Sequence, residues 1–139
     1  MSYEEKGSWV YLLVTAVTYA AYVLIILGRA QGGALAEVDY VPTMLGTIGV
    51  AIALTIVGRI AIEIAKPSDS YKTDVRDRDI GRFGEYVGGT VLALGMLVPF
   101  GLAMAEADHF WIANAIYLVF AVSALIGTTI KLVAYRRGL

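Results

Sequence analysis

The sequence has no cysteine and only one histidine, His109. Without cysteine, the chain has no disulfide, thiolate metal site, iron–sulfur ligand or cysteine nucleophile. The formal net charge of −1 gives no electrostatic support for nucleic-acid binding. A glycine-rich phosphate loop, a His-x-x-x-His pair and a serine nucleophile elbow are also missing. We therefore predict no catalytic residue, no cofactor and no nucleic-acid partner, with a lipid-acting membrane enzyme left as an alternative.

Long apolar runs dominate the chain, which is 58% hydrophobic. A helix of about 20 apolar residues crosses the hydrocarbon core of a bilayer, and in lipid the backbone must satisfy its own hydrogen bonds. Segments of sufficient length lie at residues 8–28, 41–65, 85–105 and 110–134. The sequence therefore predicts an all-α fold, an integral membrane four-helix bundle that forms a single domain over residues 1–139.

Local residues predict where these spans start, bend and turn. Pro42 fits the first turn of the second span, and Pro67 stops that span. Pro99 frees the carbonyl of Gly95, so we expect a kink in the third span. Only residues 106–109 separate the third and fourth spans, which predicts an antiparallel helical hairpin.

Basic residues are concentrated on one side of the predicted spans. That side carries Lys6, Lys66, Lys72, Arg76, Arg78, Arg82, Lys131, Arg136 and Arg137, whereas the other side has only Arg29. The positive-inside rule then places both termini and the loop at residues 66–84 in the cytoplasm. The acidic residues of the outer side and His109 match no metal-binding motif, so no metal site is predicted.

The loop before the third span alternates acidic and basic residues. Asp74 and Arg78 are four residues apart and can pair on a helix, and Thr73 or Asp74 can cap it. We expect a short cytoplasmic helix that runs into the third span. It is either a solvated stem or a docking surface for a protein partner, formed by Asp74, Arg76, Asp77 and Arg78.

Small and hydroxylated residues recur at helical spacing in the spans. The third span has a glycine face suited to close helix packing, either within the chain or in a homo-oligomer: Gly81, Gly84, Gly88 and Gly95. A second set of polar residues is predicted to face the interior: Tyr11, Thr15, Thr18, Tyr22, Asn114 and Tyr117. These residues either hydrogen-bond between helices or line a narrow cavity for a small ligand.

Arg59 and Glu63 are charged residues inside the second span, four positions apart. Charges in a membrane segment are costly and often functional, although a side chain near the end of a span can reach the headgroups. We predict a cytoplasmic-side charge network of Arg59, Glu63, Arg82, Glu85 and Lys131. It serves either as structural ion pairs with lipid-headgroup contacts or as a gate or ion-coupling site.

The segment at residues 74–85, DVRDRDIGRFGE, resembles a motif of small multi-span bacterial membrane proteins of unknown function, in which a charged Asp-x-Arg-Asp segment precedes a membrane helix. Residues 110–115 and 135–138 are also similar to that group. The resemblance implies a prokaryotic plasma membrane and no particular chemistry.

Three functional hypotheses follow. The first is a non-enzymatic module that binds or regulates a partner, favoured by the charged loop and by the absence of acids, bases and histidine near the expected bilayer midplane. The second is an oligomeric transporter or channel for a small solute, and the third is a cofactor- or lipid-binding subunit of a membrane complex. Each places the chain in contact with the bilayer, and a homo-oligomer is expected.

Overall fold

The computed structural model describes residues 1–138, and these form helices joined by short connections, with no β-strand among them. The elements are α1 (Tyr3–Ala30), the 3-10 turn η1 (Leu35–Glu37), α2 (Val41–Ala65), α3 (Val75–Gly95), α4 (Leu97–Met104) and α5 (His109–Arg137). α3 and α4 together make one span-length segment, so four segments are long and apolar enough to cross a membrane. This confirms the prediction of an all-helical chain with four candidate spans.

The segments contain 28, 25, 30 and 29 residues. At about 1.5 Å of rise per residue, they are roughly 38 to 45 Å long, which exceeds the hydrocarbon thickness of about 30 Å. Large apolar side chains are exposed along their outer faces, for example Leu24 at 70% and Ile64 at 77%. Such exposure is unfavourable in water but carries no penalty against lipid tails.

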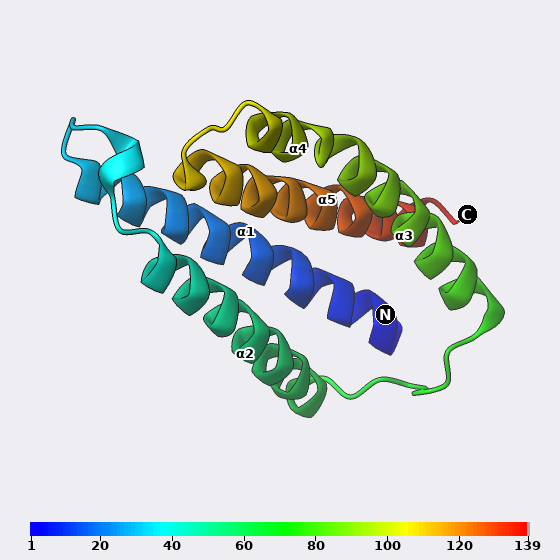
Figure 1. The fold of residues 1–139 in the computed structure, drawn as a ribbon. Helices are drawn as coiled ribbons and strands as arrows, with labels where there is room; N and C mark the ends of the chain where they lie inside the picture. Colours follow the sequence, from blue (N-terminus) through cyan, green and yellow to red (C-terminus); the bar gives the residue numbers. More distant parts are fainter. Residues whose placement is uncertain (139) are drawn as a thin grey trace.

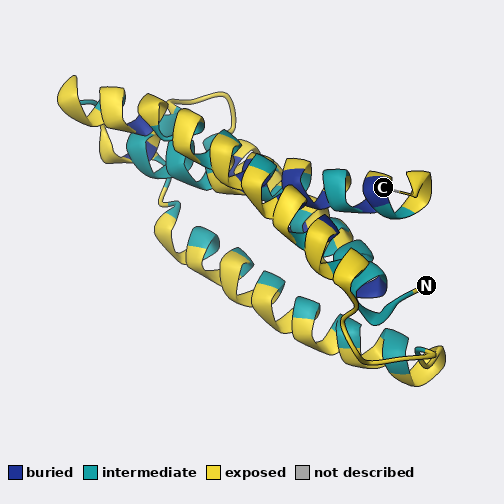
Figure 2. Ribbon diagram, turned by 90° about the vertical axis from the view of Figure 1, so that its right-hand side faces the viewer, coloured by how far each residue is buried: buried dark blue, intermediate teal, exposed yellow. Residues whose placement is uncertain are grey.

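The helices lie side by side in the order α2, α1, α5 and then α3 with α4 (Figure 1). α1 packs between α2 and α5, and α5 packs against α3 and α4 on its other side. α2 packs extensively only against α1 and contains no buried residue (Figure 2). The second span is therefore peripheral, and the space beside it is bordered by α1 and α5.

Both termini and the α2–α3 connection lie at one end of the helices (Figure 1). The connection between α1 and α2 and the α4–α5 turn lie at the other end. The short α4–α5 turn makes the antiparallel hairpin that the sequence predicts. The basic residues assigned to the cytoplasmic side consequently gather at the end that holds both termini.

Local chemistry explains the helix boundaries. The carboxylate of Asp74 accepts a hydrogen bond from the Asp77 backbone N–H at 2.7 Å, which completes a capping box at the start of α3. α3 therefore begins at Val75, well before the expected span boundary at residue 85, and the predicted cytoplasmic helix is continuous with the third span. The helix breaks between Gly95 and Leu97, close to Pro99, as predicted from the missing proline donor.

The predicted glycine face packs mainly within the chain, where α3 meets α5. A Cβ added to Gly84 would lie 2.8 Å from the carbonyl oxygen of Gly127, and one added to Gly95 would lie 2.6 Å from Val119 Cγ1. At Gly88, the backbone carbonyl accepts a 2.7 Å hydrogen bond from the Ser123 hydroxyl. Gly84, Gly88 and Gly95 thus accommodate α5 rather than a second copy of the chain. Gly81 differs because no atom lies within 4 Å of its added Cβ.

Candidate functional site

An apolar groove lies between α1, α2 and α5, with a volume of about 420 Å³. Its apolar walls include Ile48, Ile52, Ile56 and Phe120. Small lining residues such as Ala51 and Ala124 occupy little of the groove. Hydroxyl groups interrupt this surface at Tyr11, Thr15, Thr18, Tyr19, Thr55 and Tyr117. The groove therefore combines a large apolar surface with a few polar groups, the usual composition of a small-molecule site.

Four of the six residues predicted for the polar interior line this groove: Tyr11, Thr15, Thr18 and Tyr117. The other two, Tyr22 and Asn114, are joined by a 2.5 Å hydrogen bond from the tyrosine hydroxyl to the amide oxygen. The Asn114 amide also donates to the Phe110 carbonyl at 2.8 Å, which fixes its orientation. The predicted residues thus lie along the contact of α1 with its neighbours, but Tyr11 is 43% exposed and does not face the interior as predicted.

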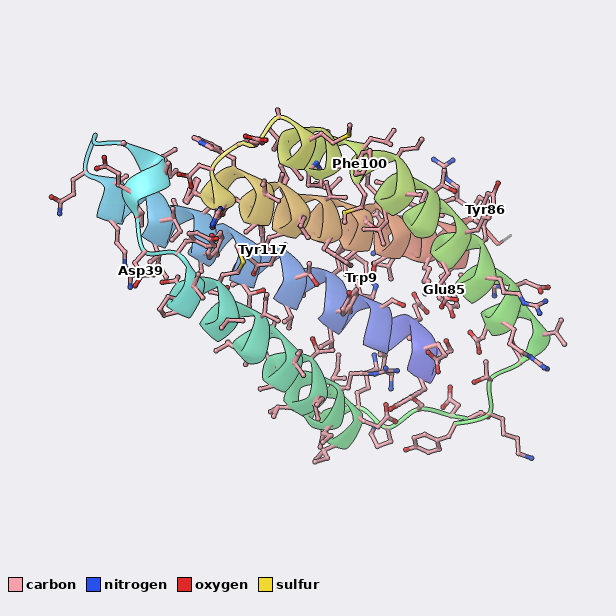
Figure 3. All side chains as sticks on the ribbon, in the orientation of Figure 1. Trp9, Asp39, Glu85, Tyr86, Phe100 and Tyr117 are labelled. Atoms are coloured by element: carbon pink, nitrogen blue, oxygen red, sulfur yellow. The ribbon has the colours of Figure 1, made fainter. Side chains whose placement is uncertain are left out.

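Tyr117 of α5, labelled in Figure 3, contacts both α1 and α2. Its ring makes edge contacts with Tyr19 and Tyr22 of α1, with centroids 5.1 and 4.9 Å apart. Its hydroxyl lies 3.1 Å from the hydroxyl of Thr47 on α2. Aromatic edge contacts and hydrogen bonds favour a defined packing of these helices, so one end of the groove is held in shape.

Tyr19 is a groove residue that the sequence analysis missed. It follows Thr15 by four residues and precedes Tyr22 by three, so it belongs to the same helical face as those two predicted residues. This spacing was sufficient to predict that Tyr19 belongs with the polar interior residues.

The groove hydroxyls differ in whether they have partners. Thr18 and Thr55 each donate to a backbone carbonyl of their own helix at 2.7 Å. Among residues 1–138, the side-chain hydroxyls of Tyr11, Thr15 and Tyr19 make no hydrogen bond. A hydroxyl in an apolar environment is costly when it has no partner. These three groups therefore offer hydrogen bonds to a polar atom of a molecule in the groove.

A separate charge cluster joins the start of α1 to the end of α2. The Lys6 side chain is only 4% exposed, and its ammonium lies 3.4 Å from Glu63 Oε2 and 2.8 Å from the Ser68 hydroxyl. The ammonium also donates to the Lys66 carbonyl at the C-terminus of α2. Glu63 additionally accepts from the Ser68 backbone N–H. All three donors of Lys6 are occupied, so this cluster is a clamp between two helices.

Arg59 also finds its partners on α1. Its Nη2 lies 3.7 Å from Glu4 Oε2, and its guanidinium carbon lies 4.9 Å from the centre of the Tyr3 ring. Gly7 makes room for this side chain, because a Cβ there would lie 2.6 Å from Arg59 Nη2. Arg59 and Glu63 are thus bound to α1 rather than to each other.

The predicted charge network is divided between two places. Arg59 and Glu63 belong to the α1–α2 clamp, whereas Lys131 pairs with Glu85 at 3.3 Å between α5 and α3. Arg82 and Glu85 line a second cavity beside Lys131. Lys6 and Glu4 complete the first part and were absent from the prediction, because the sequence did not show that α1 is the neighbour of α2.

The residues predicted as a docking loop mainly contact the chain itself. Asp74 caps α3, and one carboxylate oxygen of Asp77 accepts from the hydroxyls of Ser2 at 3.1 Å and Tyr135 at 2.8 Å. Arg76 donates to the Tyr135 carbonyl at 3.1 Å. Arg78 lines the second cavity. Asp77 and Arg76 therefore hold the segment against α1 and α5, whereas Arg78, in the described part of the chain, has only a 3.4 Å hydrogen bond to the Asp74 carbonyl.

No cluster of three or more histidine or acidic side chains suited to a metal ion occurs within the part of the chain that the structure describes. Comparison with protein-family models, with curated proteins and with solved structures finds no match for this chain.

Proposed function

We propose that this chain is a non-enzymatic binding module of the prokaryotic plasma membrane, and that it takes an apolar, lipid-soluble molecule into the groove between α1, α2 and α5. The observation that carries the proposal is the groove itself. Its volume of about 420 Å³ falls within the range of roughly 300 to 1,000 Å³ that is usual for small-molecule sites.

The lining of the groove supports a lipid-soluble ligand. Most of the surface is contributed by isoleucine, alanine and aromatic side chains on helices that are apolar enough to lie in a bilayer. The apolar part of a ligand gains little free energy when it moves from lipid to such a lining. Close packing and polar contacts must therefore provide the selectivity. The free hydroxyls of Tyr11, Thr15 and Tyr19 provide donors for a carbonyl or ether oxygen of the ligand.

The state of the charged residues favours binding over ion-coupled transport. A coupling site needs a carboxylate that exchanges protons or ions during the cycle. Glu63 instead has hydrogen bonds to both oxygens from Lys6 and Ser68, and it lies at the end of the span rather than at its centre. This arrangement supports a structural role for the clamp, and we therefore rank transport second.

The proposed location rests on charge distribution and resemblance. Basic residues gather at the end that carries both termini, so the positive-inside rule favours cytoplasmic termini. The segment at residues 74–85 resembles bacterial multi-span proteins, which favours a prokaryotic plasma membrane. A homo-oligomer remains part of the proposal, with a contact surface other than the glycine face that α5 covers.

Two phenylalanine substitutions on α2 test the groove. Ala51 lines it, whereas Ala53 is exposed on the same helix and lies outside it. Protein isolated in native lipid discs is extracted with organic solvent, and the extract is compared with bulk membrane lipid by mass spectrometry. We expect an enriched apolar compound in the wild type and in Ala53→Phe, and its loss in Ala51→Phe. Extracts that all match bulk lipid would argue against the proposal.

A further inference from the structure

A second cavity of about 300 Å³ lies at the end of the molecule that carries both termini, between α1, α3 and α5. In contrast to the groove, its lining is charged. The cations are Arg78 and Arg82 of α3 and Lys131 of α5, and the carboxylates are Glu4, Asp77 and Glu85. This headgroup-level cavity is separate from the proposed ligand groove.

The carboxylates of this cavity already have partners. Glu4 pairs with Arg59 at 3.7 Å, and Glu85 pairs with Lys131 at 3.3 Å. Asp77 accepts hydrogen bonds from two hydroxyls and from the backbone N–H of Asp74. None of these contacts involves Arg78 or Arg82, so each carboxylate has a partner other than the two arginines of α3.

The two arginines keep most of their donors free. Within residues 1–138, Arg82 makes no ion pair or hydrogen bond, and Arg78 makes only a 3.4 Å hydrogen bond from Nε to the Asp74 carbonyl. They are four residues apart, so they lie on one face of α3. Gly81 precedes Arg82, and the space around its missing side chain is open. The cavity thus presents two guanidinium groups with room between α3 and its neighbours.

The position of the cavity along α3 corresponds to the membrane surface. Charged residues fill the first turns of α3 up to Glu85, and the following residues through Ala105 carry no charge. A smaller cavity of about 270 Å³ shares Glu85 and Lys131 with the charged cavity and is also lined by Gly84, Gly88 and Gly127. The two adjoining cavities therefore suit a ligand with a charged headgroup and an apolar chain.

We propose that this cavity binds the phosphate of an anionic phospholipid, with Arg78 and Arg82 as its principal donors and an acyl chain in the adjoining cavity that Gly84, Gly88 and Gly127 line. Guanidinium groups bind phosphate oxygens in a planar, bidentate geometry, which suits arginine better than lysine for this purpose. A soluble phosphate would use the same donors, but it has no acyl chain to occupy the adjoining cavity.

The test measures binding of phosphatidylglycerol and of phosphatidylcholine with identical acyl chains to the detergent-solubilised protein by native mass spectrometry. The pocket variant is Arg78→Gln/Arg82→Gln. The matched control is Lys72→Gln/Arg137→Gln, which removes the same charge from exposed positions at the same end, outside the cavity. Losing a charge-assisted hydrogen bond to phosphate lowers affinity by about tenfold or more, so we expect the pocket variant to lose at least about tenfold for phosphatidylglycerol. The control should change by less than about twofold because its side chains do not reach the cavity.

Three results would overturn the proposal. Equal losses in the pocket variant and the control would show a diffuse surface-charge effect. Displacement of phosphatidylglycerol by inorganic phosphate at equal concentration would assign the cavity to a soluble anion. Equal binding of both lipids by the wild type would exclude headgroup selectivity without any need for a variant, even if the arginine substitutions impair folding. The Ala51→Phe variant should bind phosphatidylglycerol normally, which separates this proposal from that of the groove.

Discussion

Gly127 of α5 tests how closely α3 and α5 must approach. A Cβ added at this position would lie 2.9 Å from the Gly84 carbonyl oxygen and 3.3 Å from Gly88 Cα, and both atoms belong to the rigid backbone of α3. Backbone atoms cannot move aside as a flexible side chain does, so Gly127→Ala must separate the two helices. Such overpacking costs about 1 to 3 kcal/mol.

Gly89→Ala is the matched control, because Gly89 is also inside a long helix but has no atom within 4 Å of its added Cβ. Alanine raises helix propensity at both positions by about 0.5 to 1 kcal/mol, so this gain cancels in the comparison. The difference in free energy of unfolding between the two variants therefore isolates the packing cost and should be about 1 to 3 kcal/mol.

The assay is equilibrium unfolding in mixed micelles of mild detergent and dodecyl sulfate, followed by circular dichroism. We expect the midpoint to fall for Gly127→Ala and to rise slightly for Gly89→Ala. Equal stability of the two variants would refute the close approach of α3 and α5 and, with it, the assignment of the glycine face to packing within the chain.

Three further predictions concern polar contacts. Lys6→Met removes hydrogen bonds to neutral acceptors at the end of α2 and should lower the free energy of unfolding by about 2 kcal/mol. The control Lys72→Met, at an exposed position, should change the free energy of unfolding by less than about 0.5 kcal/mol. Equal effects of the two substitutions would contradict the clamp. Tyr22→Phe removes a hydrogen bond to α5 and should cost about 0.6 kcal/mol in the same assay, and no loss would contradict that contact. The hydrogen bond to Glu63 raises the pKa of Tyr71 above its ordinary value of 10.0. Because the folded state favours the neutral phenol, this contact stabilises the fold below pH 10 and is lost as the pH rises through the higher folded pKa. Ultraviolet titration of the wild type minus Tyr71→Phe should give a midpoint above 10, and a midpoint at or below 10 would contradict the contact.

Hydropathy and helix signals in the sequence were sufficient to predict the candidate spans and most helix boundaries. The start of α2 with Pro42 in its first turn, the break near Pro99 and the α4–α5 hairpin follow from local chemistry that acts within a few residues. The third span was predicted to begin at residue 85, whereas α3 begins at Val75. Hydropathy alone does not detect a capped polar turn that continues into an apolar helix.

The order of the helices could not be obtained in the same way. All four spans have apolar outer surfaces, so their sequences do not indicate which helices pack against one another. The charge network was consequently predicted between residues at one membrane level, whereas the structure pairs Arg59 with Glu4 and Glu63 with Lys6. The polar interior was predicted more completely, because Tyr, Thr and Asn at helical spacing mark the face that avoids lipid.

Photolabelling in the native membrane shows whether an apolar ligand occupies the groove between α1, α2 and α5. An apolar probe carrying a diazirine is activated, and the labelled residues are mapped by peptide mass spectrometry. We expect labels concentrated on groove residues such as Thr15, Phe120 and Ala124, and a selective loss of these labels when the compound extracted from the wild-type protein is added in excess. Labels spread evenly over the outer faces of the helices, with no competition at the groove, would contradict ligand binding in the groove.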